Sequence, residues 1–191
     1  DANIIVLHSK QRFGCEEIRA LSNVQLVVTT TSGWEHMDVE YLKSRGVRCA
    51  RMPMIRRDAV VESILGMLLH HNRRQWVFQD RAKQGDWARG ELAEILPHRV
   101  QDQRIAVVGL GVIGQRLVQV LDAMGATVLG CDPYIPEVHW PQIPSVPWMD
   151  IPHQADVVLF ACSHTESSHQ MVNENWLNQC QEMIFINCAR G

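Results

Sequence analysis

The 191-residue sequence has no long apolar run and no large excess of charge of one sign. Its most apolar stretch, AVVESILGMLLHH, is interrupted by Glu62 and is too short to span a bilayer. A net charge of −3 provides no electrostatic basis for binding nucleic acid or an anionic membrane. We therefore expect an ordinary globular protein with no nucleic-acid or membrane partner.

The sequence also lacks any C-x-x-C pair, although it contains six cysteines. Several of these lie in apolar, strand-like runs, namely VLGCD, LFACS and FINCA. Their scatter fits neither a disulfide framework nor a zinc site. We expect buried free thiols, no metal centre and a cytoplasmic location.

Short β-rich runs alternate with helical stretches, which predicts parallel sheets with crossover helices. The expected strands cover 3–7, 25–30, 47–50, 104–109, 127–132, 156–162 and 183–187, and the expected helices cover 15–21, 38–46, 59–82, 112–124 and 173–180. The loop from 132 to 148 is rich in proline, which argues against regular structure there.

Helix-boundary residues accompany two of these helices. Asp38 is expected to cap the second helix and Gly46 to end it. Asp58 is expected to cap the long helix, which should divide or bend near 72–74 because the apolar spacing is poor there.

A polar linker with Gly85, Gly90 and Pro97 follows the long helix and is the candidate domain boundary. We predict a partial substrate domain over 1–55, interdomain helices and linker over 56–96, and a partial dinucleotide-binding domain over 97–191.

The motif G-x-G-x-x-G occurs at Gly109, Gly111 and Gly114, between a predicted buried strand and an amphipathic helix. The first glycine permits a tight turn, the second allows backbone to approach a pyrophosphate, and the third allows close packing of helix on strand. The N–H groups of Val112 and Ile113 would then face the phosphates at the helix N-terminus.

An acidic residue completes this fingerprint. Asp132 ends the next predicted strand, 18 residues after Gly114. Its carboxylate would accept hydrogen bonds from the adenosine ribose and repel a 2′-phosphate, which favours NAD over NADP. The alternative is a coincidental Gly-rich turn in which Asp132 caps a loop.

Four stretches together resemble the D-isomer-specific 2-hydroxyacid dehydrogenases. They are TTTSGWEHMDVEYLKSRGVRCA, PMIRRDAVVESILGMLL, the segment from QGDW through the glycine motif to CDP, and the pair HTESSHQMVN and FINCARG. This resemblance implies an α/β fold with two doubly wound parallel-sheet (Rossmann-like) units, a substrate domain and an NAD-binding domain, both incomplete here. It also implies a homodimer.

The resemblance also implies roles for individual residues. The essential arginine of the A-R-G motif is Arg190, whose planar fork of donors suits a 2-oxo acid. Ser32 and Gly33 would hold the substrate carboxylate through the backbone. The remaining cofactor contacts are expected at Cys162, Ser163, Thr165, Cys188, Ala189 and Arg190.

The chain departs from the family pattern at several positions. Ser163 and His164 stand where Pro-Leu is usual. Arg56 and Arg57 replace small or polar residues near the start of the long helix. They could recognise an acidic substrate or form a solvated charge pair, and the second interpretation is favoured.

The family's proton donor is a histidine paired with a glutamate, and both follow the A-R-G motif. The chain ends one residue after Arg190, so we expect a fragment of a longer protein. Five histidines are candidate replacements, of which His36 lies nearest to the substrate loop, and no acidic residue is placed by sequence to orient any of them: His36, His70, His71, His164 and His169.

These observations predict an NAD(H)-dependent oxidoreductase that interconverts a small 2-hydroxy acid and its 2-oxo acid. Two alternatives remain open from sequence. One is an NAD(H)-binding regulator, similar to a corepressor, without turnover. The other is an inactive fragment, in which the terminal strand leaves a sheet edge with unpaired backbone N–H and C=O groups.

Overall fold

A computed structural model describes residues 2–8, 11–21, 23–86, 98–136, 139 and 142–190. The chain divides into two compact units, unit 1 over Asp1–Asp58 and unit 2 over Ala59–Gly191, and each is described by itself. Within the described ranges, no helix is long and apolar enough to cross a membrane. The predicted linker residues Gly90 and Pro97 lie outside these ranges.

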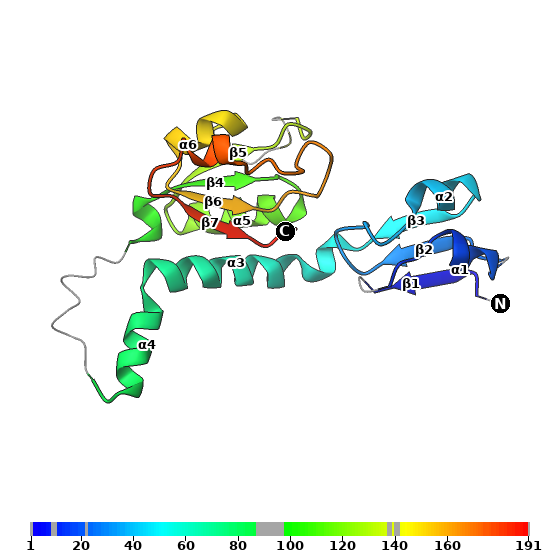
Figure 1. Ribbon diagram of the computed structural model, residues 1–191, viewed down its shortest axis with the longest axis horizontal. Coiled ribbons are helices and arrows are strands. Elements are labelled where there is room, and N and C mark those ends of the chain that lie inside the picture. The colour runs from blue at the N-terminus through cyan, green and yellow to red at the C-terminus, as the bar shows by residue number, and fades with distance from the viewer. Residues whose placement is uncertain are drawn as a thin grey trace. The chain divides into compact units, whose positions relative to one another are not determined.

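Unit 1 is a three-stranded parallel sheet in the order β1-β2-β3, with two short helices (Figure 1). The strands are β1 (Ile4–Leu7), β2 (Leu26–Thr29) and β3 (Arg48–Arg51), and the helices are α1 (Cys15–Arg19) and α2 (Val39–Ser44). The predicted boundaries of α2 are confirmed. The Asp38 carboxylate accepts the Tyr41 N–H at 3.0 Å, and Gly46 has a φ of +74°, which favours glycine.

The long helix predicted over 59–82 forms two helices. A 3₁₀ turn, η1 (Pro53–Arg56), runs directly into α3 (Arg57–Asn72), and α4 (Gln75–Lys83) follows. The predicted break near 72–74 is confirmed, because Arg74 has a left-handed φ of 50°.

The prediction that Asp58 caps the long helix is wrong. The chain is already helical before this residue, because Pro53 begins the 3₁₀ turn and α3 starts at Arg57. Asp58 lies inside the first turn, where its carboxylate accepts two hydrogen bonds from Arg57 at 3.0 and 2.9 Å. For Arg57, this ion pair supports the solvated-pair interpretation.

Unit 2 contains a four-stranded parallel sheet in the order β5-β4-β6-β7 (Figure 1). The strands are β4 (Arg104–Val108), β5 (Thr127–Cys131), β6 (Val157–Phe160) and β7 (Ile184–Asn187). The other elements are the 3₁₀ turns η3 (Val100–Asp102) and η5 (Trp148–Asp150) and the helices α5 (Val112–Ala123), α6 (Ile151–Gln154) and α7 (Glu174–Leu177). All four strands were predicted.

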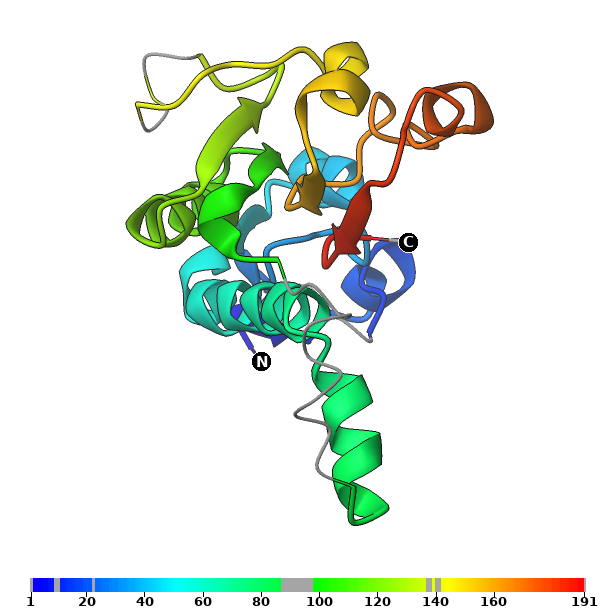
Figure 2. The same cartoon turned by 90° about the vertical axis from the view of Figure 1, so that its left-hand side faces the viewer.

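The central strands β4 and β6 are buried on both faces of this sheet, as their continuous apolar sequences require. Ile105 and Val107 pack with α3 and α5, whereas Ala106 and Val108 pack with α6 and α7. Figure 2 shows the sheet between these two sets of helices. The alternation of side chains along β4 therefore builds two cores, and only the loops at the strand ends remain for binding.

No helix was predicted between the proline-rich loop and the strand at 156–162, where η5 and α6 occur. Pro152 lies in the first turn of α6, where a missing N–H costs nothing. Trp148, in η5, stacks on Trp176 of α7 at 4.2 Å between ring centroids, which fixes this segment on the sheet.

A reciprocal pair of buried amides joins the end of α3 to the start of β4. Asn72 donates to Gln103 at 2.7 Å, and Gln103 donates back at 3.2 Å.

Replacing Asn72 by alanine leaves the Gln103 amide buried and unpaired. We expect the free energy of unfolding to fall by about 2 kcal/mol, measured by urea denaturation. Asn72→Leu together with Gln103→Leu, which removes both amides, should recover part of this loss; equal stability of Asn72→Ala and wild type would contradict the assignment.

Candidate cofactor and substrate site

The carboxyl ends of the unit 2 strands meet at one edge of the sheet. Val108 pairs with Cys131 on one side and with Phe160 on the other, and Phe160 pairs with Asn187. The residues that follow these four therefore lie side by side, although they are far apart in sequence. They include most of the predicted cofactor contacts, at the edge where ligands bind in open α/β sheets.

The glycine loop between β4 and α5 has the geometry that the motif predicts. Gly109 has a φ of +92°, and a Cβ there would lie 2.5 Å from the Cys162 backbone. A Cβ on Gly114 would lie 1.9 Å from the Gly109 carbonyl oxygen. In contrast, a Cβ on Gly111 would meet no protein atom within 4 Å. Gly111 therefore borders open space, as the close approach of a pyrophosphate requires.

The two residues expected to face the phosphates begin α5. Val112 is the first helical residue and 37% of its surface is exposed, while Ile113 is half-buried and packs against the core. The first N–H groups of a helix have no partner within it, and the helix dipole favours an anion there. The structure thus fits the diphosphate of a dinucleotide at this turn.

Asp132 stands at the end of β5, beside the glycine loop. Its carboxylate accepts the N–H of Leu110 at 2.7 Å, of Tyr134 at 2.9 Å and of Ile135 at 3.1 Å. The bond to Leu110 ties the glycine loop to the next strand. Asp132 therefore caps a loop and stands beside the fingerprint at the same time, so the two interpretations weighed from sequence are compatible.

The loop after β6 is held by its own hydroxyl groups. Ser168 Oγ accepts the Thr165 N–H at 2.8 Å and contacts the Ser163 carbonyl at 3.0 Å. The Tyr134 hydroxyl, from the loop after β5, hydrogen-bonds to Ser167. His164 and His169 pack edge to face at 5.7 Å. The chain thus replaces the usual Pro-Leu with a different, polar, internally bonded loop.

The segment after β7 is shaped by Asn187. Its side-chain oxygen accepts the Ala189 N–H at 2.9 Å, and its amide donates to the Arg190 carbonyl at 2.8 Å. The Arg190 guanidinium is exposed and donates to the Ala189 carbonyl at 2.9 Å. Cys188 is half-buried against the core, so the turn presents the arginine outward at the strand end.

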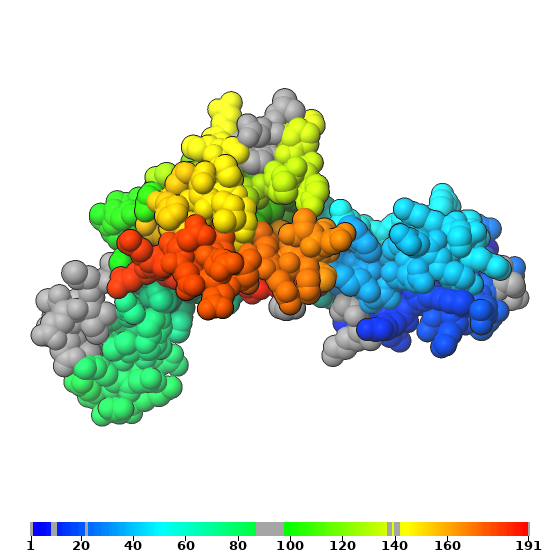
Figure 3. Space-filling model, turned by 45° about the horizontal axis from the view of Figure 1, so that its top comes forward, coloured from blue at the N-terminus to red at the C-terminus, as the bar shows by residue number. Residues whose placement is uncertain are grey.

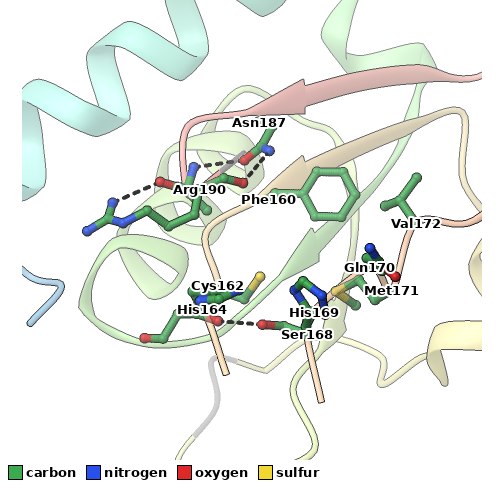
Figure 4. Close-up of a pocket in the computed structure, with 12 residues that line it drawn as sticks. Phe160, Cys162, His164, Ser168, His169, Gln170, Met171, Val172, Asn187 and Arg190 are labelled. Atoms are coloured by element: carbon green, nitrogen blue, oxygen red, sulfur yellow. Dashed lines mark hydrogen bonds between the residues drawn. The ribbon is translucent and has the colours of Figure 1, made fainter. Parts of the chain in front are cut away.

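A pocket of about 580 Å³ opens between the loops after β6 and β7. Figure 4 shows Cys162 and His164 on one wall and Asn187 and Arg190 on the other. In the space-filling view the orange loop after β6 adjoins the red segment around α7 (Figure 3). The lining residues are Phe160, Cys162, Ser163, His164, Ser168, His169, Gln170, Met171, Val172, Asn187, Ala189 and Arg190.

The cysteines at this edge are not suited to nucleophilic chemistry. Burial raises the pKa of the Cys131 thiol to about 11, and burial also raises the pKa of Cys162. Both thiols stay protonated near neutral pH, whereas the thiolate is the nucleophile. All six cysteines are free, and Cys131 is the most buried of them. Among the described residues, no cluster of side chains could hold a metal ion.

Ser32 and Gly33, the predicted carboxylate-binding residues, lie in unit 1 in the loop after β2. The Ser32 carbonyl accepts a hydrogen bond from Arg51 at 3.2 Å, and the Gly33 carbonyl accepts one from Thr31 at 2.8 Å. Thr29 and Arg51 are the last paired residues of β2 and β3, so this loop lies at the carboxyl edge of its own sheet.

Several residues at these edges were not singled out from sequence. Asn187 could have been found, because an asparagine side chain commonly accepts the backbone N–H two residues further along the chain. Arg51 could not, because the register of β2 and β3 brings it to Ser32. Thr29 and Thr31 could not either, because their contacts depend on the conformation of the folded loop.

Residues 65–191 match the family model described as the D-isomer specific 2-hydroxyacid dehydrogenase, NAD binding domain. The chain belongs to this family. The matched segment contains the glycine loop, Asp132 and the whole pocket, and NAD(H) is the cofactor of such a domain. The family resemblance inferred from sequence is therefore confirmed, as is the α/β fold.

Individual proteins similar to this chain are also named as dehydrogenases or reductases. The chain is 25% identical over 174 residues to human glyoxylate reductase/hydroxypyruvate reductase, covering 89% of this chain and 53% of that protein. It is 34% identical over 133 residues to erythronate-4-phosphate dehydrogenase of Azotobacter vinelandii, covering 70% of this chain and 29% of that protein. The structure is similar to that of Aquifex aeolicus D-lactate dehydrogenase complexed with NAD and lactic acid, with a TM-score of 0.86, 25% identity, and coverage of 100% of this chain and 57% of that chain.

The chain thus spans about half the length of the curated dehydrogenases it matches, or less. These relatives are named as enzymes, so the comparisons do not favour the non-enzymatic regulator considered from sequence.

Proposed function

We propose that this protein is an NAD-dependent oxidoreductase that interconverts a small 2-hydroxy acid and its 2-oxo acid. The observation that carries the proposal is the position of Arg190. The arginine lies on an exposed turn at the carboxyl end of β7, clamped by Asn187, and it lines the same pocket as Cys162. A fixed guanidinium at a ligand-binding edge suits a substrate with carboxylate and carbonyl oxygens.

In this proposal Arg190 binds and polarises the carbonyl oxygen of the 2-oxo acid. A cation stabilises the negative charge that develops on this oxygen, and its effect is large where water is excluded. The backbone of the loop around Ser32 and Gly33 binds the substrate carboxylate. When bound, NADH supplies the hydride.

The cofactor would be held by the glycine loop and by the loops after β5, β6 and β7. Gly111 leaves space for the diphosphate, with Val112 and Ile113 at the helix N-terminus, and Gly109 and Gly114 shape the turn. Asp132 would accept a ribose hydroxyl and disfavour a 2′-phosphate, so NAD is the preferred coenzyme. The remaining proposed contacts are Cys162, Ser163, Thr165, Cys188, Ala189 and Arg190.

We further propose a cytoplasmic homodimer. The six free cysteines support a reducing compartment. The dimer is supported by the family resemblance alone.

The experiment that tests the function is NADH oxidation by the protein at its full natural length, with a panel of 2-oxo acids such as glyoxylate, pyruvate and hydroxypyruvate. We expect turnover with at least one of them and a lower KM for NADH than for NADPH. Tight NADH binding without turnover on any 2-oxo acid would refute the enzymatic proposal and favour a regulator.

A further inference from the structure

We infer that three side chains beneath the loop after β2 position two backbone N–H groups for the substrate carboxylate. The three are Thr29, Thr31 and His36, and the N–H groups are those of Gly33 and Trp34. This inference rests on the proposed function and deepens it, because it assigns positioning residues to the carboxylate-binding loop of unit 1.

The three side chains are joined in one continuous series of hydrogen bonds, which we call the threonine–histidine chain. Thr31 Oγ1 lies 2.8 Å from the Gly33 carbonyl oxygen and 2.8 Å from Thr29 Oγ1. Thr29 Oγ1 in turn lies 2.9 Å from His36 Nε2. Thr29 is fully buried and Thr31 is 8% exposed, so water does not compete for these hydroxyls. The threonine–histidine chain therefore links the Gly33 carbonyl to the half-buried His36.

The direction of every bond in this chain follows from the number of protons. A carbonyl oxygen can only accept a hydrogen bond, so the Thr31 hydroxyl donates its single proton to the Gly33 carbonyl. Thr29 must then donate to Thr31, which uses the only proton of Thr29. His36 Nε2 must therefore be the donor to Thr29. The Thr31 N–H, at 3.3 Å, supplies the second bond that Thr29 Oγ1 accepts. The hydroxyl of Thr29 is thus saturated, and His36 is fixed with a proton on Nε2.

A second contact fixes the neighbouring carbonyl. Arg51 Nη1 donates to the Ser32 carbonyl at 3.2 Å, and its guanidinium lies 4.6 Å from the centroid of the Trp34 ring. The carbonyls of Ser32 and Gly33 are therefore both held by side chains, one by Arg51 and the other by the threonine–histidine chain.

Holding the two carbonyls orients the two N–H groups that follow them. In a planar trans peptide the C=O and the N–H point in opposite directions. The Ser32 carbonyl sets the direction of the Gly33 N–H, and the Gly33 carbonyl sets that of the Trp34 N–H. Within the described part of the chain, neither N–H donates to another group. Two adjacent backbone N–H groups, each following a held carbonyl and neither of them used among the described residues, are available as donors to an anion.

The first test is a ¹⁵N NMR spectrum of the imidazoles in the full-length protein, with His36 assigned by comparison with His36→Gln. We expect neutral His36 to carry its proton on Nε2, and we expect Thr29→Val to abolish this preference. A neutral His36 protonated on Nδ1 would overturn the inference, whatever the enzyme turns over.

The second test follows binding with oxamate, a carboxylate analogue of a 2-oxo acid that is not reduced. In the presence of NADH, oxamate should shift the amide resonances of Gly33 and Trp34. Oxamate shifts without turnover on any 2-oxo acid would support this inference while refuting the proposed function. Turnover without these shifts would refute this inference alone.

The third test uses matched variants in steady-state kinetics. Thr31→Val removes the hydroxyl at nearly constant shape and should raise KM for the 2-oxo acid about 10- to 100-fold, with a smaller change in kcat. Thr31→Ser keeps the hydroxyl and should stay within about 3-fold of wild type. Thr30→Val is the control, because Thr30 bonds to the Leu7 carbonyl at 3.4 Å and not to the loop. A KM for Thr31→Val equal to that of Thr30→Val would overturn the inference.

Discussion

Replacing Gly114 by alanine is expected to unfold the cofactor-binding end of unit 2. The new Cβ would lie 1.9 Å from the Gly109 carbonyl oxygen and 2.9 Å from the Gly109 carbonyl carbon. Both atoms belong to the backbone, so α5 must move away from β4. We expect a loss of about 3 kcal/mol or more in the free energy of unfolding, because overpacking a rigid contact strains the backbone. Urea denaturation and NADH binding measure the two consequences.

Two other glycines provide controls. Gly66 lies in α3, where a Cβ would meet nothing within 4 Å, so Gly66→Ala should be neutral or stabilise by about 0.5–1 kcal/mol. Gly111→Ala should fold normally, since its Cβ also meets no protein atom. Its NADH affinity should nevertheless fall about 10-fold or more, because the Cβ occupies the path of the diphosphate. Wild-type stability in Gly114→Ala would disprove the close contact of helix and strand.

Replacing Arg190 by glutamine is expected to lower kcat/KM for the 2-oxo acid by about 10²- to 10³-fold in the full-length enzyme. The variant removes the cation that would stabilise charge on the carbonyl oxygen, and it leaves the Asn187 clamp on the backbone intact. Arg190→Lys should recover only part of the loss, because a lysine lacks the planar fork. Stopped-flow NADH oxidation measures the effect on the hydride step.

The control for this variant is Arg48→Gln, an exposed arginine at the amino end of β3 that alters net charge equally. NADH affinity should change by less than about 3-fold in both variants. A kcat/KM for Arg190→Gln similar to that of Arg48→Gln would show that Arg190 has no role in the reaction.

The fold was predictable wherever a local pattern and a long-range requirement coincided. The run from β4 through the glycine loop to α5 combines a buried strand, three glycines with distinct steric roles and an amphipathic helix. The α2 helix carried both a capping aspartate and a terminating glycine. Each of these features acts on neighbouring residues, so the sequence alone contains enough information.

Predictions failed where the local rule had a competitor. Asp58 has the residue type of a cap, but Pro53 had already started the turn. The short helix α6 was not predicted at all, because its four residues are too few to show a helical period and Pro152 stands in its first turn. The threonine–histidine chain depends on distances between side chains, and only the folded loop sets these distances. No spacing in the sequence could therefore have revealed these hydrogen bonds.

The hydrogen bonds of the Asp132 carboxylate also bear on how the proposed preference for NAD over NADP could be changed. Two carboxylate oxygens offer about four lone-pair positions, and the N–H groups of Leu110, Tyr134 and Ile135 already take three of them. A ribose diol would find about one acceptor left. Replacing Asp132 by a residue without an acceptor, such as alanine, would admit a 2′-phosphate but would also free the Leu110 N–H and loosen the glycine loop. If Asp132 selects the coenzyme as proposed, an exchange of NAD for NADP therefore requires a replacement that still accepts this N–H, or compensating changes in the loop.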